Sequence, residues 1–266
     1  MLINELMNLG GKTALVTGGA GYIGSQICDA LLELDAKVIS VSRGKSRSFI
    51  EKTVENNEFI SLKHDLSSKD GVDSCLKEVC SLSEDIDILI NNFYTFPKEF
   101  SFFLQDWCDY EEAFSTSLIS PLYLTKKILK MMIEKEKEGS IINIASMYGK
   151  ISPDFSIYGN REMKGKIGVG IDYCVSKASL IQIAKYVASI GGKYGIRCNS
   201  ISPGPFSKPG TFKGKKWFEK KLKEKTMLNR IGNNDELKGS IALLASDLST
   251  YITGEDIAVD GGWTAW

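Results

Sequence analysis

The stretch TALVTGGAGYIG, residues 13–24, decides how this chain folds. A short apolar run leads into three spaced glycines, and apolar side chains then recur at helical spacing. Glycine allows a tight turn, and the first turn of the following helix offers unpaired N–H groups to a pyrophosphate. This context favours a dinucleotide-binding loop over an ordinary loop. The residues expected to contact the dinucleotide are Gly18, Gly21, Tyr22, Ile23 and Gly24.

Short runs rich in β-branched residues alternate with helical patterns along the chain. Several runs are apolar almost throughout, as expected of parallel strands that are buried on both faces. We therefore expect an α/β fold: a single Rossmann-type doubly wound parallel sheet with helices on both faces, in one domain over residues 1–266. Length alone would also allow two small domains. The predicted strands are Thr13–Thr17, Val38–Val41, Phe59–Leu62, Ile86–Ile90, Ser140–Ala145, Ile196–Ile201 and Asp256–Val259.

Composition excludes several classes of function. Lys plus Arg and Asp plus Glu both number 33, so the chain carries no overall field that would attract nucleic acid or a membrane surface. Its first residues lack the apolar run of a signal peptide, and its six cysteines and one histidine lack metal-ligand spacing. We expect a cytoplasmic protein with reduced thiols and a small-molecule substrate, and without a metal, nucleic-acid or membrane partner.

Two segments interrupt the strand–helix rhythm. Residues 147–171 are rich in glycine and polar groups, and residues 203–225 open with PGPFSKPG and then become strongly basic. In parallel sheets ligands bind outside the carboxyl ends of the strands, where such segments lie. We interpret them as an active-site insertion and a substrate flap.

The end of the second predicted strand bears on the choice of cofactor. It reads Val41-Ser42-Arg43 and is followed by Lys45 and Arg47, whereas an acidic residue there would favour NAD. A guanidinium suits a 2′-phosphate, both as a charge and as a bidentate donor. Ser42 and Arg43 therefore favour NADP, although NAD stays possible and the segment could be an ordinary solvated loop.

Three further polar residues follow predicted strands. Asp65 comes after the third strand, and Asn91 and Asn92 come after the fourth. Such side chains could bind the adenine and line the cofactor cleft. Asp and Asn also form turns, which is the alternative interpretation.

The segment YCVSK, residues 173–177, opens a predicted helix. Tyr173 and Lys177 are four residues apart and so lie on one helical face. A free tyrosine titrates near ~10, and a neighbouring ammonium group lowers that value towards the range useful for acid/base catalysis. Ser146 ends the fifth predicted strand, where its hydroxyl could hydrogen-bond a substrate oxygen.

Together these motifs resemble the short-chain dehydrogenase/reductase family. They keep the family's order over nearly the whole chain, and the basic segment and terminal tail look most like members found in bacterial surface-polysaccharide and flagellin-glycan pathways. The motifs are TGGAGYIG, the pair Asp65-Leu66, Asn91-Asn92, INIAS ending at Ser146, YCVSK, IRCNSISPG (196–204) and YITGEDIAVDGG (251–262).

The resemblance implies an oxidoreductase that moves a hydride between a nicotinamide and a carbinol or carbonyl carbon, usually as a homotetramer or homodimer. Tyr173 would exchange the proton, Lys177 would bind the nicotinamide ribose and tune Tyr173, and Ser146 would orient the substrate. The other residues that it assigns to the cofactor are Asp65, Leu66, Asn91, Asn92, Pro203 and Gly204.

Some features depart from the family's shorter, single-domain branch. The glycine spacing T-G-x-x-G-x-x-G and the long interval from Ser146 to Tyr173 are typical of the larger branch of nucleotide-sugar epimerases and dehydratases. The chain nevertheless ends soon after TGEDIAVDGG, so we expect a single-domain member with an enlarged active-site loop.

Two substitutions affect the expected site directly. The family's NNAG motif becomes NNFY here, which brings Tyr94 towards the substrate. The family's catalytic Asn, which helps hold a water of the proton relay, aligns with Ser117. Pro121 still predicts a helix kink there. Ser117 or the local backbone would then hold the water; slower turnover or a relay closed by another group are the alternatives.

The basic segment suggests the kind of substrate. Eight lysines lie between residues 208 and 225, against Glu219 and Glu224. Lys215 and Lys216 could attract a sugar phosphate or nucleotide-sugar of glycan biosynthesis, with Tyr94 and Tyr148 against its ring, although a lysine-rich helix can simply be solvated.

Other interpretations stay open for the rest of the chain. Trp263 and Trp266 are expected at a subunit interface. The alternative functions are an epimerase or dehydratase that retains its cofactor, and a non-catalytic cofactor sensor.

Overall fold

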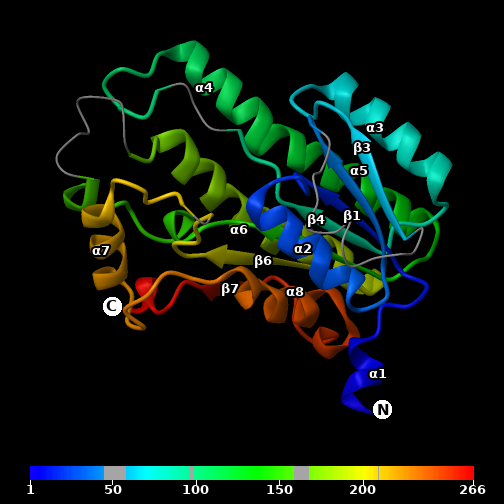
Figure 1. The fold of residues 1–266 in the computed structure, drawn as a ribbon. Coiled ribbons are helices and arrows are strands. Elements are labelled where there is room, and N and C mark those ends of the chain that lie inside the picture. Colours follow the sequence, from blue (N-terminus) through cyan, green and yellow to red (C-terminus); the bar gives the residue numbers. More distant parts are fainter. Residues whose placement is uncertain (45–57, 96–98, 159–167, 209) are drawn as a thin grey trace.

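The computed structural model describes residues 1–44, 58–95, 99–158, 168–208 and 210–266. Its strands form one parallel sheet in the order β3-β2-β1-β4-β5-β6-β7 (Figure 1). All seven predicted strands are confirmed, each to within two residues at either end. Their bounds are β1 Thr13–Thr17, β2 Lys37–Ser42, β3 Phe59–Lys63, β4 Ile88–Asn91, β5 Gly139–Ile144, β6 Ile196–Pro203 and β7 Asp256–Val259.

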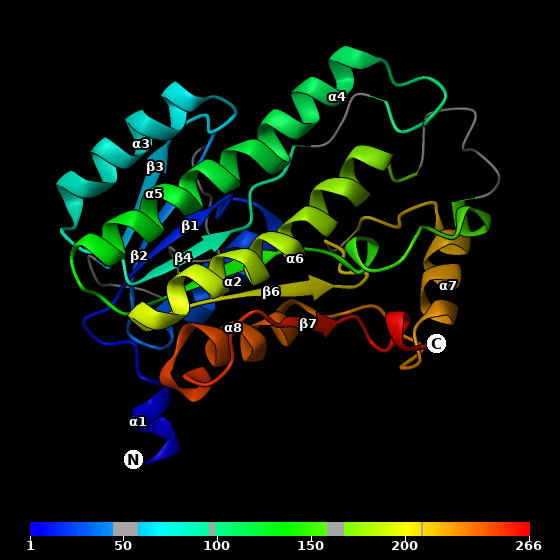
Figure 2. The same ribbon diagram turned by 180° about the vertical axis from the view of Figure 1, so that it is seen from behind.

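Helices cover both faces of the sheet, as predicted. Leu15 of β1 packs towards α3, α5 and α6, whereas its neighbours Ala14 and Val16 pack towards α2 and α8, because successive strand side chains point to opposite faces. Figure 1 is drawn from the side of α2 and α8, and Figure 2 from the opposite side. None of the described helices has the length and apolar character needed to cross a membrane. The helices are α1 Ile3–Met7, α2 Tyr22–Leu32, α3 Lys69–Leu82, α4 Trp107–Phe114, α5 Ser120–Glu134, α6 Ile171–Gly191, α7 Lys216–Lys225 and α8 Lys238–Ala245.

The strand order fixes where a ligand can bind. From β1 the chain builds outward through β2 to β3, then returns to the other side of β1 and continues from β4 to β7. Crossover connections diverge at such a switch point and leave a crevice outside the carboxyl ends of the strands. All seven strands are parallel, so the loops after β1, β4, β5 and β6 reach this same edge.

The two irregular segments pack against each other beside that edge. The first contains the 3₁₀ turns Met147–Gly149 and Phe155–Tyr158, while its residues 159–167 lie outside the described part. In the second, Leu222 of α7 joins a buried cluster with Tyr148 and Tyr158. The basic segment therefore packs against the residues that follow β5, at the carboxyl edge of the sheet.

The expectation that Trp263 lies at a subunit interface is wrong for this residue. Its side chain is buried within its own chain, with its ring edge-on to Tyr148 at 6.4 Å between centroids. Gly261 and Gly262 both have positive φ, which turns the chain back after β7. Trp266 is exposed, and its indole N–H donates to the carbonyl of Lys225 at 2.9 Å.

Candidate active site

A cavity of about 340 Å³ lies at the carboxyl edge of the sheet, beyond β4, β5 and β6. It brings together side chains and backbone from loops that are far apart in the sequence. Nine residues that the sequence assigned to the cofactor, the chemistry or the substrate line it: Ile23, Asn92, Tyr94, Ser146, Tyr148, Tyr173, Lys177, Pro203 and Gly204.

Tyr173, Lys177 and Ser146 converge in this cavity. Tyr173 and Lys177 lie one turn apart in α6, and Lys177 Nζ is 5.7 Å from the centroid of the Tyr173 ring. Nζ donates to the carbonyl of Ile144, the last residue of β5, at 2.7 Å. Ser146 follows β5 and hydrogen-bonds the Tyr173 phenol. A phenol, an ammonium and a hydroxyl thus face one space.

Burial is the main influence on the pKa values of Lys177 and Tyr173. The Lys177 side chain is 5% exposed, and loss of hydration lowers its pKa to about 8. Burial raises the pKa of the Tyr173 phenol, and the hydrogen bond with Ser146 offsets part of that increase. The expectation that the pKa of Tyr173 would be lowered by Lys177 is not met here, because burial raises it.

Tyr94 places a second phenol against the first. Its ring meets the Tyr173 ring edge-on at 4.8 Å and an interplanar angle of 80°. Lys177 Nζ is 5.7 Å from the Tyr94 ring as well. Burial, followed by the charge of Asp172, raises the pKa of Tyr94, so this phenol stays protonated at neutral pH.

Ser117 lies in an irregular turn, at the break that Pro121 predicted. Residues Ser115–Ile119 form a π-helical turn between α4 and α5, and Pro121 stands in the first turn of α5. Proline has no N–H, so the Ser117 carbonyl lacks the donor that an α-helix would supply four residues on. The Ser117 hydroxyl is buried and has no partner among the described residues. The Ser117 hydroxyl is therefore open to a further partner, although Ser117 does not line the cavity.

The glycine loop is shaped for a diphosphate. Gly18 has a φ of +70°, and its N–H donates to the carbonyl of Val41 at 2.7 Å. A β-carbon on Gly24 would come within 2.1 Å of the Gly18 carbonyl oxygen. Helix α2 begins after Gly21 without a side-chain cap, so the N–H groups of its first turn stay open to phosphate oxygens. These residues fit a dinucleotide.

The adenosine end contains fewer free groups than the sequence predicted. Ser42 Oγ accepts from the Ala20 N–H at 3.0 Å and so holds the glycine loop. Asp65 Oδ1 accepts from Ser67 N–H at 3.0 Å, which is the turn role named as its alternative. The Leu66 side chain is buried in the core, so its backbone alone is left for a cofactor. Arg43 is exposed, with its guanidinium 5.9 Å from the Phe93 ring centroid, while Lys45 and Arg47 lie outside the described residues.

The two asparagines after β4 are placed differently from each other. Asn91 is 2% exposed, and its amide donates to Thr125 Oγ1 at 2.8 Å and to Asn143 Oδ1 at 2.9 Å. It supports the sheet, so the expectation that its side chain lines the cleft is corrected. Asn92 lines the cavity and donates to the carbonyls of Thr17 and Gly18. It holds the glycine loop beside β4.

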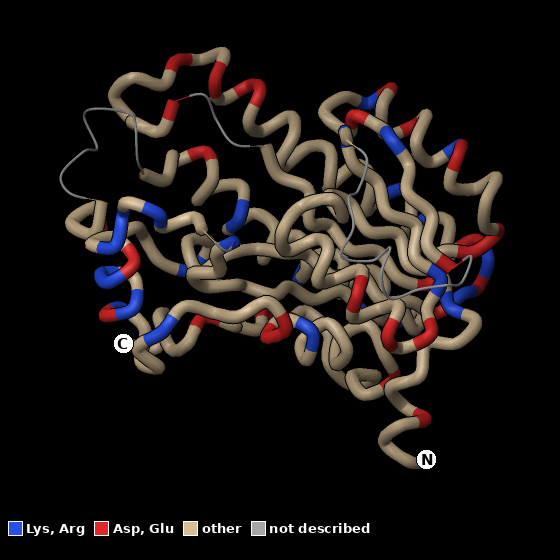
Figure 3. Tube along the Cα trace, viewed as in Figure 1, with Lys and Arg blue, Asp and Glu red and all other residues tan. Residues whose placement is uncertain are grey.

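Lys215 and Lys216 do not line the cavity. They begin the basic helix α7, where Figure 3 shows several lysines together. Neither side chain forms an ion pair or hydrogen bond with the described residues, whereas the lysines farther along α7 are engaged. Lys220, Lys221, Lys223 and Lys225 bind Glu224, the carbonyl of Ser156, Glu219 and Asp154 respectively.

Sequence reasoning missed much of the apolar wall. Tyr148 was predicted to contact substrate, and its hydroxyl is bound to that of Tyr158 at 2.9 Å, which leaves its ring to the cavity. Phe206 follows PGP in a segment already assigned to substrate, so it could have been found. Phe100 and Val169 stand in irregular loops without a periodic signal. The wall residues that were missed are Phe100, Met147, Val169 and Phe206.

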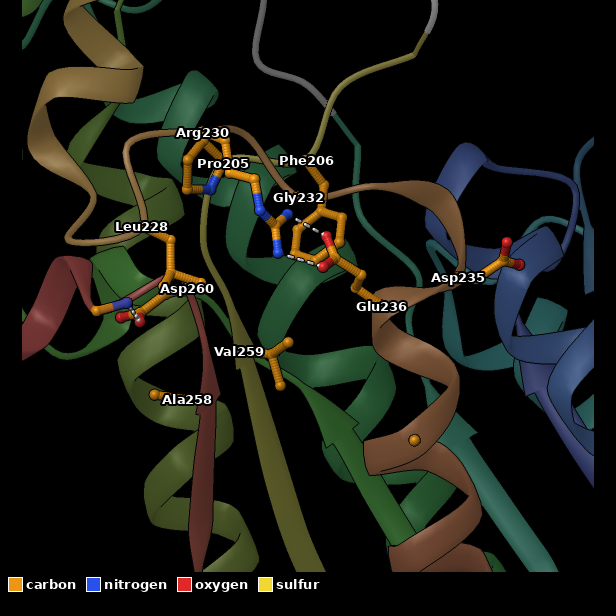
Figure 4. A pocket seen from close by; sticks show the side chains of 13 residues that line it. Pro205, Phe206, Leu228, Arg230, Gly232, Asp235, Glu236, Ala258, Val259 and Asp260 are labelled. Carbon is orange, nitrogen blue, oxygen red and sulfur yellow. Dashed lines mark hydrogen bonds and ion pairs between the residues drawn. The ribbon is translucent and has the colours of Figure 1, made fainter.

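A second, larger cavity of about 500 Å³ shares Phe206 with the first; Figure 4 shows the residues that line it. Its charged groups are largely paired with each other. Arg230 donates to both carboxylate oxygens of Glu236, at 2.7 and 2.5 Å, and Asp260 accepts from the Gly262 N–H at 2.9 Å. This larger cavity contains none of the predicted catalytic residues. We therefore assign the chemistry to the smaller cavity.

Comparisons with known proteins agree with this geometry. A family model described as enoyl-(acyl carrier protein) reductase matches residues 18–264. A 3-oxoacyl-(acyl-carrier-protein) reductase, FabG, of Buchnera aphidicola is 32% identical over 96% of this chain and 98% of its own length. The 2-dehydro-3-deoxy-D-gluconate 5-dehydrogenase of Dickeya dadantii is 28% identical over the full length of both chains.

Solved structures extend the likeness to the whole fold. A short-chain dehydrogenase from Leptospira borgpetersenii, with bound NAD+, superposes with a TM-score of 0.86. It is 28% identical, and the match covers 99% of this chain and 97% of the other. The family model spans most of the chain, and Ser146, Tyr173 and Lys177 line one cavity together with Ile23 from the glycine-rich stretch. The chain therefore belongs to the short-chain dehydrogenase/reductase family of NAD(P)-dependent oxidoreductases.

Proposed function

We propose that this protein interconverts a ketone and a secondary alcohol, with Tyr173 as the acid/base and NADP as the preferred cofactor. The observation that carries the proposal is the convergence of Ser146, Tyr173 and Lys177 in one cavity. A bound nicotinamide would supply or accept the hydride. The protein's own part is then to orient the carbonyl and to move one proton.

We assign that work to four residues. Ser146 hydrogen-bonds the substrate oxygen and fixes its direction. Tyr173, protonated because burial raises its pKa, donates the proton during reduction. Lys177, as an ammonium below about pH 8, stabilises the phenolate that remains. Ser117 would hold a water of the relay through its hydroxyl, which is buried and has no partner among the described residues.

Replacing Tyr173 with Phe removes the proton donor and keeps the ring. We expect kcat to fall roughly 10²- to 10⁴-fold, the usual contribution of a positioned acid or base. Binding of NADPH, followed by its fluorescence, should stay within about twofold. The matched control is Tyr186→Phe, an exposed tyrosine on the same helix, which should turn over like the wild type. Unchanged turnover in Tyr173→Phe would exclude this residue as the acid/base.

The preference for NADP rests on Arg43. It is the first residue after β2, it is exposed, and it lies over the Phe93 ring, where a guanidinium can bind a 2′-phosphate beside the adenine. Ser42, which precedes it, is already engaged by the glycine loop. The charge needed to distinguish the two cofactors would therefore come mainly from Arg43.

Arg43→Ala should weaken NADPH binding about 10- to 100-fold, as expected for the loss of a charge-assisted hydrogen bond. Binding of NADH, which lacks the 2′-phosphate, serves as the internal control and should change less than threefold. Titration of each reduced cofactor by fluorescence gives both constants. Equal weakening of the two would show that Arg43 does not recognise the phosphate.

For the substrate we propose a sugar phosphate or a nucleotide-sugar. The aromatic rings of Tyr94 and Tyr148 offer flat walls for a sugar ring, and the wall of the cavity continues into α7. At the start of α7, Lys215 and Lys216 have no carboxylate partner among the described residues, so they are available to a phosphate. The sugar-acid dehydrogenase among the relatives supports a polyhydroxylated ketone, whereas FabG supports a β-ketoacyl thioester as the rival.

The double variant Lys215→Ala/Lys216→Ala should lower kcat/KM about fivefold or more for phosphorylated ketosugars, and hardly at all for neutral ones. The assay is NADPH oxidation with a panel of ketosugar phosphates, keto-nucleotide-sugars, neutral ketosugars and a β-ketoacyl thioester. Lys220→Ala/Lys223→Ala removes the same charge from the same helix at ion-paired positions and is the control. Equal effects on phosphorylated and neutral sugars would refute the role of the flap.

The other expectations are distinguished by the same assay. An epimerase or dehydratase would convert a nucleotide-sugar without net change in cofactor absorbance, and a cofactor sensor would bind NADPH without turning over any ketone. A homodimer or homotetramer and a place in glycan biosynthesis stay predictions from the resemblance.

A further inference from the structure

A fully buried carboxyl group lies directly behind the wall of the catalytic cavity. Asp172 precedes Tyr173 in the first turn of α6 and has 0% exposed surface. Gly170 lines the cavity, and a β-carbon there would come within 2.1 Å of Asp172 Oδ1 and 3.2 Å of Gln105 Nε2. The backbone of Gly170 therefore forms the cavity wall at this point, with the Asp172 carboxylate and its partner Gln105 packed against it.

Gln105 connects this carboxylate to the loop that precedes α4. Its amide donates to Asp172 Oδ1 at 2.8 Å and to the carbonyl of Glu99 at 3.3 Å. The Glu99 side chain in turn accepts from the N–H groups of Phe100 and Ser101, both at 2.7 Å. Residues 99–105 thus fold on themselves and are fastened to α6 beside the catalytic tyrosine.

The loop forms part of the cavity itself. Phe100 lines it, whereas the next three apolar residues, Phe102, Phe103 and Leu104, are more than half exposed. Apolar packing of those three side chains within this chain therefore contributes little to holding the loop. The buried Gln105–Asp172 hydrogen bond joins this loop, and with it Phe100, to the start of α6.

Several buried polar atoms around the Gln105–Asp172 bond have no hydrogen-bond partner within the described part of the chain, which is energetically unfavourable. Asp172 Oδ2, Gln105 Oε1 and Ser101 Oγ are all buried and have no partner among the described residues. A buried carboxylate with an unsatisfied oxygen is unfavourable, and an apolar pair would pack here without that penalty. Polar pairs of this kind fix one orientation of two elements more sharply than apolar contacts do.

We infer that Asp172, acting through Gln105, is a positioning residue that holds the 99–105 loop against the start of α6 and so sets the shape of the substrate cavity. The inference rests on the proposed function, since it takes this cavity as the substrate site. The charge of Asp172 also helps to keep Tyr94 protonated, and Tyr94 is a wall residue of the cavity that packs edge-on against Tyr173.

Amide hydrogen exchange measured by mass spectrometry tests, without any substrate, whether the Gln105–Asp172 bond holds the 99–105 loop against α6. In the NADPH-bound enzyme, Gln105→Ala and Asp172→Ala should each speed exchange over residues 99–107 roughly tenfold. Among the described residues, the Leu104 and Gln105 N–H groups bond only within the loop, to the Ser101 carbonyl, so they open more easily once the loop loses its bond to α6. Asp172→Asn keeps an acceptor for Gln105 and should stay within about threefold of wild type. This result does not depend on which substrate is used, or on whether the proposed function is right.

Kinetics then test the consequence for the site, with whichever ketone of the panel is reduced. Gln105→Ala and Asp172→Ala should raise KM roughly tenfold, as for one lost hydrogen bond to a charged group, while kcat changes less than threefold. The double variant should be no worse than either single variant, since both remove the same bond. Asp172→Asn should restore KM to near the wild-type value.

Asp85→Ala is the matched control: it removes a carboxylate, bound to Lys135 and Lys137, from the amino end of the sheet. It should change neither exchange over 99–107 nor KM. Should Asp172→Ala fail to fold, Gln105→Ala decides alone. Unchanged exchange and KM in Gln105→Ala, or additive effects in the double variant, would overturn the inference.

Discussion

The ammonium group of Lys177 is buried where water cannot solvate it, and the rest of the site follows from that constraint. Its hydrogen bond within the described structure is to a neutral carbonyl at the end of β5. A buried cation with a neutral partner is costly, and its pKa falls to about 8 accordingly. A proton held this loosely at neutral pH is suited to a relay. In the proposed reaction, the neighbouring phenol gives up its own proton to the substrate and leaves a stabilised phenolate.

The parallel sheet makes this arrangement possible. Lys177 and Tyr173 come from one helix, but the carbonyl and hydroxyl that meet them come from the end of β5, and the glycine loop comes from the end of β1. Because every strand runs in the same direction, these ends meet at one edge regardless of their distance along the chain. Asn92, bound to the carbonyls of Thr17 and Gly18, joins the cofactor loop to this edge.

The sheet and the meeting of Ser146, Tyr173 and Lys177 in one cavity could be predicted because their signals are local. Strand runs, the glycine spacing and the Tyr173–Lys177 interval all follow from backbone periodicity. The direction of the shift in the Tyr173 pKa could not be predicted, since it is raised by burial, which depends on the tertiary structure. The position of Asn91 at the end of a strand predicts that its side chain lines the cleft. Its amide instead donates hydrogen bonds to Thr125 and Asn143 inside the protein.

Other features could not be predicted from the sequence because they too depend on tertiary contacts. Trp263 was expected at an interface, but two glycines in the left-handed region return it to its own core. The Gln105–Asp172 bond joins residues 67 positions apart, and neither belongs to a motif. Lys215 and Lys216 looked like their neighbours in α7, and the structure alone separates the unpaired lysines from the ion-paired ones.

The pH profile of ketone reduction tests the buried Lys177–Tyr173 pair most directly. Lys177 is charged below its pKa and neutral above it, so its support for the phenolate is present at neutral pH and is lost as pH rises. We predict that kcat/KM is flat at neutral pH and falls about tenfold per pH unit above pH 8. A profile that stays flat to pH 10 would contradict the account, because the reaction would then not depend on the Lys177 proton.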